Sequence, residues 1–377
     1  MNRQETISPW QMATLFLSFL TGSAVVNIPA PLVGAAKNGA WISLLLAGSV
    51  GMLLLFCILY LHKQYPGLTF IDYSRKAIGN GLTVFFSIPF LMALFLMLTN
   101  IVIDIGGFMT STMMERTPHV VFHGLILMTA AITVREGIEV MARMFTFLLY
   151  VMTAFVTIVL FLAFNNYHPE YLLPVLPDGF RPVLHGTYLS LGFPYLELVV
   201  FAMILPFCRK EKGNLLSKLM VSALVVNIIS LLTVTICSIM VLGPLTGMRK
   251  YSVFAVARMV DVAEIIRRIE SVIGMSLIAG SYMKATIVLF VITMALSQLL
   301  KLQDDRILVY PIALVGLLMS VTMYKTPVEF NDMVLIVWPL FIFIVWIVPL
   351  ILITLVTVFK GKKGKSGPAA EKKINAQ

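Results

Sequence analysis

The sequence has little charge. Only 12% of its 377 residues are Asp, Glu, Lys or Arg, whereas 59% are hydrophobic. Soluble domains average about 25% charged residues, so half that fraction excludes an ordinary soluble protein. The hydrophobic residues also occur in runs of roughly 20, the length that crosses a bilayer as a helix. The sequence therefore predicts an all-α, polytopic integral membrane protein.

Cysteine and histidine are scarce as well. The three cysteines, Cys57, Cys208 and Cys237, show no paired spacing, which indicates neither a disulfide framework nor a metal site. The five histidines are interpreted as scattered, without HxxxH or similar metal-ligand spacing. We recognise no nucleophile–base arrangement, nucleotide loop or metal cluster, so the chain is predicted not to be an enzyme and to need no metal or cofactor.

Positive charge is present, with a net charge of +10, but it is not arranged for nucleic acid. A cluster of it lies in the stretch "KGKKGKSGPAAEKK", from Lys360 to Lys373. Beside a membrane helix, such a cluster is typical of a topology signal that faces anionic lipid. No basic motif with interleaved aromatic residues accompanies it. Residues 359–377 are therefore predicted to form a basic cytoplasmic tail, and nucleic-acid binding is not expected.

Ten hydrophobic runs are candidates for membrane spans, although the fourth is short. They lie near residues 10–34, 40–61, 82–110, 119–134, 143–164, 185–207, 215–243, 270–299, 306–323 and 332–358. The first is interpreted as a retained span, because it runs on without the small-residue cleavage site of a signal peptide. Residues 1–358 then form a single transmembrane domain with two five-span halves, about 10–164 and 185–358.

An even number of spans places both termini on one side of the membrane. Most Lys and Arg residues of the connections fall on that side, which predicts cytoplasmic termini. The long connection on the other side, residues 244–270, has hydrophobic residues at helical spacing, with Arg258, Asp261, Glu264 and Arg267 between them. It is interpreted either as an external helix lying on the membrane surface or as a solvated connector.

Two spans contain residues that interrupt helices. The first reads "TGSAVVNIPAPLVG" from residue 21 to 34, and the sixth has Gly192 and Pro194 at the middle of "HGTYLSLGFPYLELVVFAMILPF". Freed backbone groups are tolerated at membrane depth only where protein or a water-filled cavity surrounds them. Since these spans open the two halves, the paired interruptions predict a 5+5 inverted repeat with discontinuous helices 1 and 6 around a ligand site. The alternative is that Gly and Pro only kink these helices.

The ends of the half-helices suggest what such a site would hold. N–H groups near Val25 and Tyr195 would point to the middle of the membrane, where they suit a carboxylate. Carbonyl groups near Thr21 and Leu191 would suit an ammonium group. A small zwitterion is therefore the expected ligand.

Several polar residues lie inside the spans. Lys284 is far from either end of its span, and a lysine at a helix centre costs about 2.5–3.5 kcal/mol, so a partner or a cavity is expected. Glu197 is similarly central, and Asn100 and Asp104 share one face of the third span. The partner of Lys284 is left open among Glu197, Asp104 and broken backbone. The predicted ligand-binding residues are Thr21, Gly22, Ser23, Ala24, Asn27, Asn100, Asp104, Gly192, Phe193, Tyr195, Glu197, Tyr282 and Lys284.

Five segments carry a resemblance to a known family. They are "ISPWQMATLFLSFLTGSAVVNIPAPL" (7–32), "YPGLTFIDYSRKAIG" (65–79), "REGIEVMARMFTF" (135–147), "GFPYLELVVFAMILPF" (192–207) and "IGMSLIAGSYMKATIVLF" (273–290). The chain resembles the B subunits of bacterial spore germinant receptors, endospore-germination permeases of the amino acid–polyamine–organocation superfamily. It departs from them at "NGAW", Asn38 to Trp41, where an acidic residue is frequent in the family.

The resemblance implies a fold similar to sodium-coupled amino acid transporters. It also implies a location in the spore inner membrane, beside a larger A subunit and a lipid-anchored C subunit. The B subunit of such receptors is thought to recognise the germinant, usually a small amino acid and sometimes a sugar or nucleoside. Relatives of this fold form a cation site between spans one and eight, so Lys284 is hypothesised to replace a bound sodium ion.

Three functions remain open at this point. The chain could sense a germinant at the broken helices and pass a conformational change to partner subunits. It could instead be a secondary transporter of amino acids or other small amines, with Lys284 or Glu197 carrying a proton. It could also be an ion-conducting component without a small-molecule site. The residues alone favour transport, whereas the family resemblance favours the germinant-sensing subunit.

Overall fold

The computed structural model describes residues 5–209, 213–260 and 269–365. In these ranges the regular elements are helical, apart from an isolated bridge between Ile7 and Cys208. The α-helices are α1 (Pro9–Thr21), α2 (Ala24–Asn27), α3 (Pro29–Ala36), α4 (Ala40–Gln64), α5 (Phe70–Ile78), α6 (Asn80–Thr112), α7 (His119–Glu136), α8 (Ile138–Leu162), α9 (Arg181–Ser190), α10 (Phe201–Ile204), α11 (Leu215–Leu242), α12 (Ser252–Met259), α13 (Glu270–Leu300), α14 (Val309–Thr322), α15 (Pro327–Asp332), α16 (Trp338–Ile342) and α17 (Val348–Lys365). Short 3-10 or π turns join some of them, including η4 (Leu191–Tyr195), η5 (Leu196–Val200), η7 (Gly243–Met248), η9 (Met333–Val337) and η10 (Phe343–Ile347). The all-α prediction is confirmed.

Seven helical segments of the described chain are long and apolar enough to cross a membrane. They are Pro29–Gln64, Asn80–Thr112, Ile138–Asn166, Arg181–Phe207, Leu215–Met248, Glu270–Leu300 and Pro327–Lys360. The other predicted spans correspond to α1, α7 and α14, helices of 13, 18 and 14 residues. The chain is a multi-pass membrane protein, and the number of ten spans stays a prediction.

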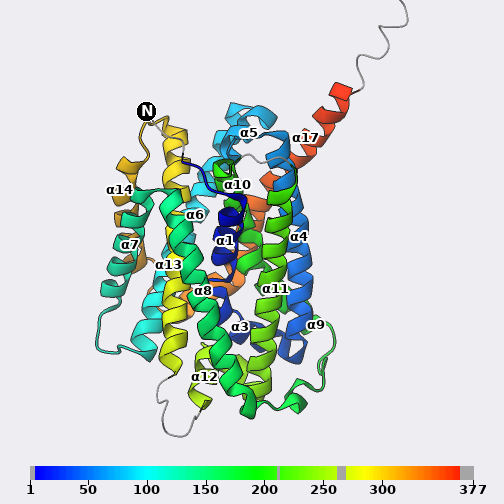
Figure 1. Cartoon of the computed structure of the whole chain (residues 1–377), viewed down its shortest axis with the longest axis vertical. Coiled ribbons are helices and arrows are strands. Elements are labelled where there is room, and N and C mark those ends of the chain that lie inside the picture. Colours follow the sequence, from blue (N-terminus) through cyan, green and yellow to red (C-terminus); the bar gives the residue numbers. More distant parts are fainter. Residues whose placement is uncertain (1–4, 210–212, 261–268, 366–377) are drawn as a thin grey trace, which may run out of the picture.

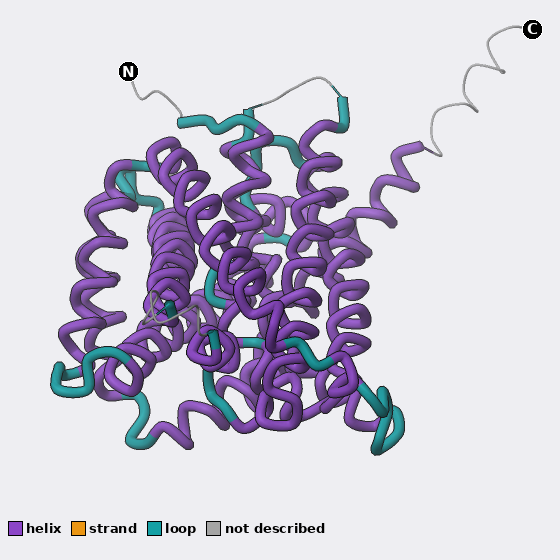
Figure 2. Tube along the Cα trace, turned by 60° about the horizontal axis from the view of Figure 1, so that its bottom comes forward, coloured by secondary structure: helices purple, strands orange, loops and turns teal. Residues whose placement is uncertain are grey.

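The helix bundle has two distinct ends. The start of α1 and the end of α17 lie at one end with α5, hereafter the terminal end (Figures 1 and 2). The opposite end, hereafter the distal end, carries α3, α9 and α12 (Figure 1). The two broken spans run between these ends, so their interruptions fall inside the bundle.

The start of α1 follows from its local sequence. The Ser8 hydroxyl accepts a hydrogen bond from the Gln11 amide at 3.2 Å, and the Gln11 side chain accepts one from the Ser8 amide at 2.9 Å. This reciprocal capping satisfies two of the N–H groups that a helix start leaves free. Pro9 fits the first helical position because it has no N–H to satisfy.

α1 and α13 form the buried centre of the bundle. α1 packs against α11, α8 and α13. Because lipid is as apolar as leucine, this association depends on close packing and not on hydrophobic burial. Phe16 and Phe19 of α1 meet Phe201 of α10 edge to face, with ring centroids 4.9 and 5.4 Å apart. These buried rings fill the bundle on the terminal side of both breaks.

The connection between α11 and α13 begins with η7 and α12. η7 leads into α12, which buries Val253, Phe254 and Val256. α12 packs against α13 and α11. The described part of the connection is therefore a helix whose apolar face meets protein, and its position relative to the membrane surface stays a prediction. The rest of the predicted segment, residues 261–268, lies outside the described residues.

Candidate functional site

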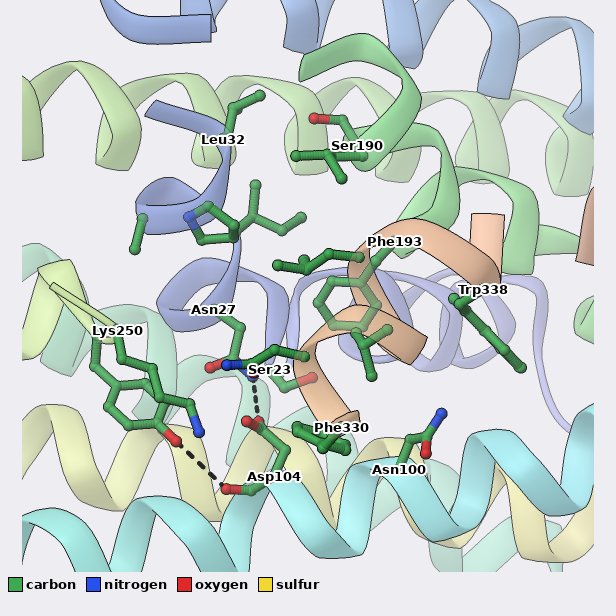
Figure 3. A pocket seen from close by; sticks show the side chains of 18 of the residues that line it. Ser23, Asn27, Leu32, Asn100, Asp104, Ser190, Phe193, Lys250, Phe330 and Trp338 are labelled. Atoms are coloured by element: carbon green, nitrogen blue, oxygen red, sulfur yellow. Dashed lines mark hydrogen bonds between the residues drawn. The ribbon is translucent and has the colours of Figure 1, made fainter. Parts of the chain in front are cut away.

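A cavity of about 390 Å³ lies beside both broken spans. Its walls come from α2, α3, α6, α9, η4, η5, η7, the start of α12, and the α15 to α16 region (Figure 3). The polar residues of the lining are Ser23, Asn27, Asn100, Asp104, Ser190, Glu197, Arg249, Lys250, Tyr251 and Asn331. Cavities of this size suit small organic ligands.

The first break lies at Gly22, between α1 and α2. α1 ends at Thr21, and Gly22 has backbone angles outside the helical region, at φ −30° and ψ −89°. α2 then runs for only four residues before α3 begins. Ser23 and Asn27 line the cavity, whereas Gly22 and Ala24 are buried outside the lining.

The second break is a π turn followed by a 3-10 turn. Within η4, Phe193 has extended backbone angles, φ −154° and ψ 109°, and Pro194 supplies no N–H to continue a helical ladder. η5 follows for five residues and α10 for four. Phe193 and Glu197 line the cavity, together with Ser190 at the end of α9.

The expectation drawn from half-helix ends concerns the segments that follow the two breaks. After the first break, Ile28 between α2 and α3 has helical backbone angles, and after the second break η5 leads directly into α10. The breaks therefore lie where the sequence places them, and helical backbone follows each of them; that its N–H groups bind a ligand stays a prediction. The strong charges near the cavity belong to side chains.

The central lysine has an acidic partner. Lys284 Nζ lies 2.6 Å from Glu197 Oε2, and the two side chains are 1% and 2% exposed. The same ammonium lies 3.6 Å from the ring centroid of Phe193 and 5.4 Å from that of Phe19. The alternatives that the sequence left open for Lys284 thus resolve to Glu197, with the two aromatic faces adding cation–π attraction.

Lys284 itself does not line the cavity. Phe193 and Glu197 do, so they separate the ammonium from any molecule held there. A direct contact between Lys284 and a ligand would require these residues to move. Its role as a substitute for a sodium ion stays a prediction, because the neighbours of its ammonium are one carboxylate and two rings.

Asp104 joins three walls of the cavity. Asn27 Nδ2 of α2 donates a hydrogen bond to Asp104 Oδ2 at 2.5 Å, and the Tyr251 hydroxyl donates to the main-chain oxygen of Asp104 at 3.5 Å (Figure 3). One turn earlier on α6, Asn100 Oδ1 accepts a 2.9 Å hydrogen bond from the Tyr324 hydroxyl. The i,i+4 spacing of Asn100 and Asp104 does place both on one wall, as expected.

Three of the predicted residues lie next to the breaks but outside the cavity lining. Thr21 accepts a 3.1 Å hydrogen bond from Asn227 of α11. Gly192 lies so close to Pro339 that a Cβ atom would collide with its ring. Tyr195 is fully buried against Gly51 of α4. None of these predicted residues lines the cavity.

Tyr282 lies on another side of α13. Its hydroxyl is 2.6 Å from the Thr133 hydroxyl of α7, and its ring packs edge to face on Phe145 of α8. Lys284, two residues later, meets the broken sixth span instead. The structure therefore does not bring Tyr282 together with the cavity.

Most of the lining residues were missed in the sequence, among them Lys250, Tyr251, Phe330 and Trp338. Lys250 and Tyr251 belong to the connection interpreted as external, and Phe330 and Trp338 belong to the start of the last span (Figure 3). The available signal was "MRKY", a cation beside an aromatic residue directly after the seventh span. Aromatic residues at a span end usually indicate the lipid interface, so the signal was ambiguous.

The histidines need one correction. His119 and His123 do have HxxxH spacing, at the start of α7, and their ring centroids are 6.4 Å apart, so the prediction that this spacing is absent is wrong. His119 Nδ1 lies 3.0 Å from the Thr110 hydroxyl, and His123 Nδ1 lies 2.9 Å from the Ser320 hydroxyl. Among the described residues no group of three or more His, Cys, Asp and Glu side chains could hold a metal ion.

A helical membrane protein with two broken spans around a cavity has the architecture of small-molecule transporters, and two solved structures share the fold. The first is MhsT in complex with L-phenylalanine, with a TM-score of 0.68 and 12% identity, covering 95% of this chain and 99% of that one. The second is Mhp1, a nucleobase-cation-symport-1 family transporter in a closed conformation with bromovinylhydantoin bound. It has a TM-score of 0.63 and 13% identity, covering 88% of this chain and 75% of that one.

The family itself follows from the sequence match. The family model described as spore germination protein matches residues 6–329, and the chain belongs to this family. It is 27% identical to spore germination protein KB of Bacillus subtilis (strain 168), over 89% of this chain and 90% of the relative. It is 25% identical to YndE of the same organism over 64% of this chain and 65% of the relative. The predicted family resemblance is confirmed.

Proposed function

We propose that this chain is the germinant-sensing membrane subunit of a spore germinant receptor. It binds a small molecule in the cavity at the breaks of helices 1 and 6. Its ten helices form a 5+5 inverted repeat, both termini are cytoplasmic, and it works in the spore inner membrane beside A and C subunits. The observation that supports this proposal is a cavity between two broken spans, lined by polar and charged side chains, in a member of the spore germination protein family.

The arrangement of the cavity supports a binding-driven change of shape. Its walls belong to segments far apart in the chain, from α2 to α16. A ligand that contacts all of them stabilises the conformation in which they are close. Only a difference in affinity between two conformations is needed to shift their populations, and the partner subunits then respond to the favoured conformation.

Secondary transport is the second candidate, and the shared fold supports it. MhsT and Mhp1 have this architecture, and the buried Lys284–Glu197 pair is a candidate proton carrier. Proteoliposomes that contain only this chain separate the two functions. Net uptake of a radiolabelled ligand down an imposed proton or sodium gradient supports transport, whereas saturable binding without uptake supports sensing.

The binding site is tested by filling the cavity. Val334→Trp places an indole in the cavity, whereas Val337→Trp makes the same change on the same stretch outside the lining. We expect purified Val334→Trp to lose binding of a panel of amino acids, sugars and nucleosides that wild type and Val337→Trp retain. Equal binding by both variants would place the ligand elsewhere, and no binding by wild type would overturn the proposed function.

A further inference from the structure

His123 is a buried histidine at the contact of three helices. It belongs to α7, is 3% exposed, and lies between α6 and α14. Its Nδ1 atom lies 2.9 Å from the Ser320 hydroxyl of α14. Its Nε2 atom faces the main chain of α6, where a Cβ atom at Gly106 would collide with the ring. The imidazole therefore fits against α6 because residue 106 is a glycine.

The hydroxyl of Ser320 determines which ring nitrogen carries the hydrogen. It donates to the Leu317 carbonyl at 2.8 Å, a local hydrogen bond that serine side chains often form in helices. A hydroxyl has only one hydrogen, so Ser320 accepts from His123, and Nδ1 is the protonated nitrogen of the neutral ring. Nε2 then has a lone pair and, within the described chain, no hydrogen-bond partner.

The charged form of His123 would not be satisfied in this place. Its second N–H would be on Nε2 and would face Gly106, where the described chain offers no acceptor. A buried charge without a hydrogen bond is costly. The ring of His119, one turn earlier on α7, is 6.4 Å away between centroids and would repel His123 when both are charged. The contact as folded therefore suits the neutral imidazole.

Neighbouring charges do not compensate a proton on His123. It forms no ion pair within the described ranges 5–209, 213–260 and 269–365. The ammonium of Lys250 would lie 3.7 Å from a Cβ atom at Gly107, so the charge beside this stretch of α6 is also positive. The other charged or titratable side chains of α7 and of the helices packed against it are Arg135 and Glu136 on α7, Asp104 on α6, Glu139, Arg143 and Tyr150 on α8, Glu270, Tyr282 and Lys284 on α13, and Tyr310 on α14.

The three-helix contact also supports one wall of the cavity. Asp104 lies two residues before Gly106 on α6, and Asn100 lies one turn before Asp104; both line the cavity. Tyr324, four residues after Ser320, donates a 2.9 Å hydrogen bond to Asn100. A change at His123 therefore acts within two helical turns of this wall, through both α6 and α14.

We propose that His123 is a proton-sensitive switch of the α6–α7–α14 contact, which opens when the imidazole is protonated and so loosens the cavity wall formed by Asn100 and Asp104. In the open form water reaches Nε2 and hydrogen-bonds the charged ring. The open form binds one proton more than the closed form, so a fall in pH shifts the population toward it. This regulation goes beyond the proposed function, because it needs no ligand.

Hydrogen–deuterium exchange with mass spectrometry measures the opening, on the full-length chain in lipid nanodiscs. Labelling times are scaled for the intrinsic pH dependence of amide exchange. An imidazole in water titrates near about pH 6.5, so the open form should be about tenfold more populated at about pH 5.5 than at about pH 7.5. We expect peptides of α6, α7 and α14 to exchange about tenfold faster at the lower pH, and peptides of α11, which contains no histidine, to be unchanged.

Three variants assign the effect to one side chain. In His123→Asn the amide can still donate to Ser320 but takes up no proton, so exchange should be equal at the two pH values. His119→Asn makes the same change one turn away and should keep most of the acceleration. A variant with His62, His119, His168 and His185 all replaced by Asn retains only His123 of the five histidines and should keep it too. This variant reports on His123 even if His123→Asn does not fold.

Three results overturn the inference. Wild-type exchange that is equal at both pH values would mean that the contact does not respond to protons. The same acceleration in His123→Asn as in wild type, or its loss in the variant that retains only His123, would assign the response to another group. Since no ligand is added, each of these results leaves the proposed function standing, and a failed binding test at the cavity leaves the switch standing.

Discussion

The main chains of Gly22 and Gly280 are in direct contact at the first break. A Cβ atom at Gly22 would lie 2.7 Å from the carbonyl oxygen of Gly280 and 2.8 Å from that of Ser18. A Cβ atom at Gly280 would collide with the carbonyl group of Gly22. Small residues permit such close approach of membrane helices, so two glycines allow the broken segment to pack directly on α13.

This contact predicts a large effect from a single methyl group. Gly280→Ala should destabilise the protein by about 1–3 kcal/mol, because backbone atoms cannot move aside as a flexible side chain can. Gly124→Ala on α7 is the matched control, since nothing lies within 4 Å of its added methyl group. It should be neutral or stabilise by up to about 1 kcal/mol through helix propensity. Thermal unfolding in detergent measures both.

Equal unfolding temperatures for the two glycine variants would contradict the contact. The contact also decides how the site can be tested. A bulky residue at Gly22 disturbs helix packing on α13, so a loss of binding in such a variant would not report on the ligand. Substitutions on the cavity wall avoid this problem.

A second prediction concerns the buried charges. Lys284→Met removes the cation and leaves Glu197 buried without its ionic partner, which should cost about 3–5 kcal/mol. The double variant Lys284→Met, Glu197→Gln removes both charges and should recover most of that loss. A double-mutant cycle on detergent unfolding gives the coupling. Additive effects of the two single variants would mean that the ion pair contributes nothing.

Much of the central architecture could be predicted because single residues in the sequence, such as those that interrupt helices or place a charge in a span, indicate it. Gly22 and Pro194 both disfavour a continuous helix, and the structure breaks within a residue or two of them. Lys284 and Glu197 are costly in lipid, so each had to have a partner. Their pairing needed the tertiary structure, since nothing in the sequence fixes which helix faces meet.

The wrong predictions about the candidate site also have causes that can be named. Tyr282 was grouped with Lys284 because the two are close in sequence, but residues at i and i+2 do not share a helix face. Lys250 was missed because its connection looked external, whereas η7 and α12 fold back into the bundle. A connection's path depends on what it packs against, and spacing of apolar residues does not reveal whether that is lipid or protein.

A third prediction concerns access to the cavity. Met248 of the lining is 78% exposed, whereas Leu20, on the terminal side of the first break, is fully buried. With the three native cysteines replaced by serine, Val334→Cys should react with a membrane-impermeant thiol reagent at least tenfold faster than Leu20→Cys. A bound ligand should protect Val334→Cys. Comparable labelling of both positions would show that the cavity also opens toward the terminal end.

The fourth prediction concerns the closure of the terminal end. Glu5 accepts a 2.8 Å hydrogen bond from the Ile138 amide at the start of α8 and pairs with Arg306 at 3.1 Å. On the next residues of the same segment, the Ile7 amide donates to the Phe207 carbonyl at 2.9 Å. The segment before α1 therefore joins the ends of the sixth span, α8 and the α13–α14 connection.

Removing the Glu5 side chain should loosen this junction without touching the cavity. A hydrogen bond to a charged group contributes about 1.5–3 kcal/mol, so Glu5→Ala should speed amide exchange at Ile138 by tenfold or more. Glu136→Ala removes an exposed acid next to the same helix start and should leave that exchange unchanged. Hydrogen–deuterium exchange with mass spectrometry measures both. Unchanged exchange in Glu5→Ala would show that the segment before α1 does not hold the start of α8.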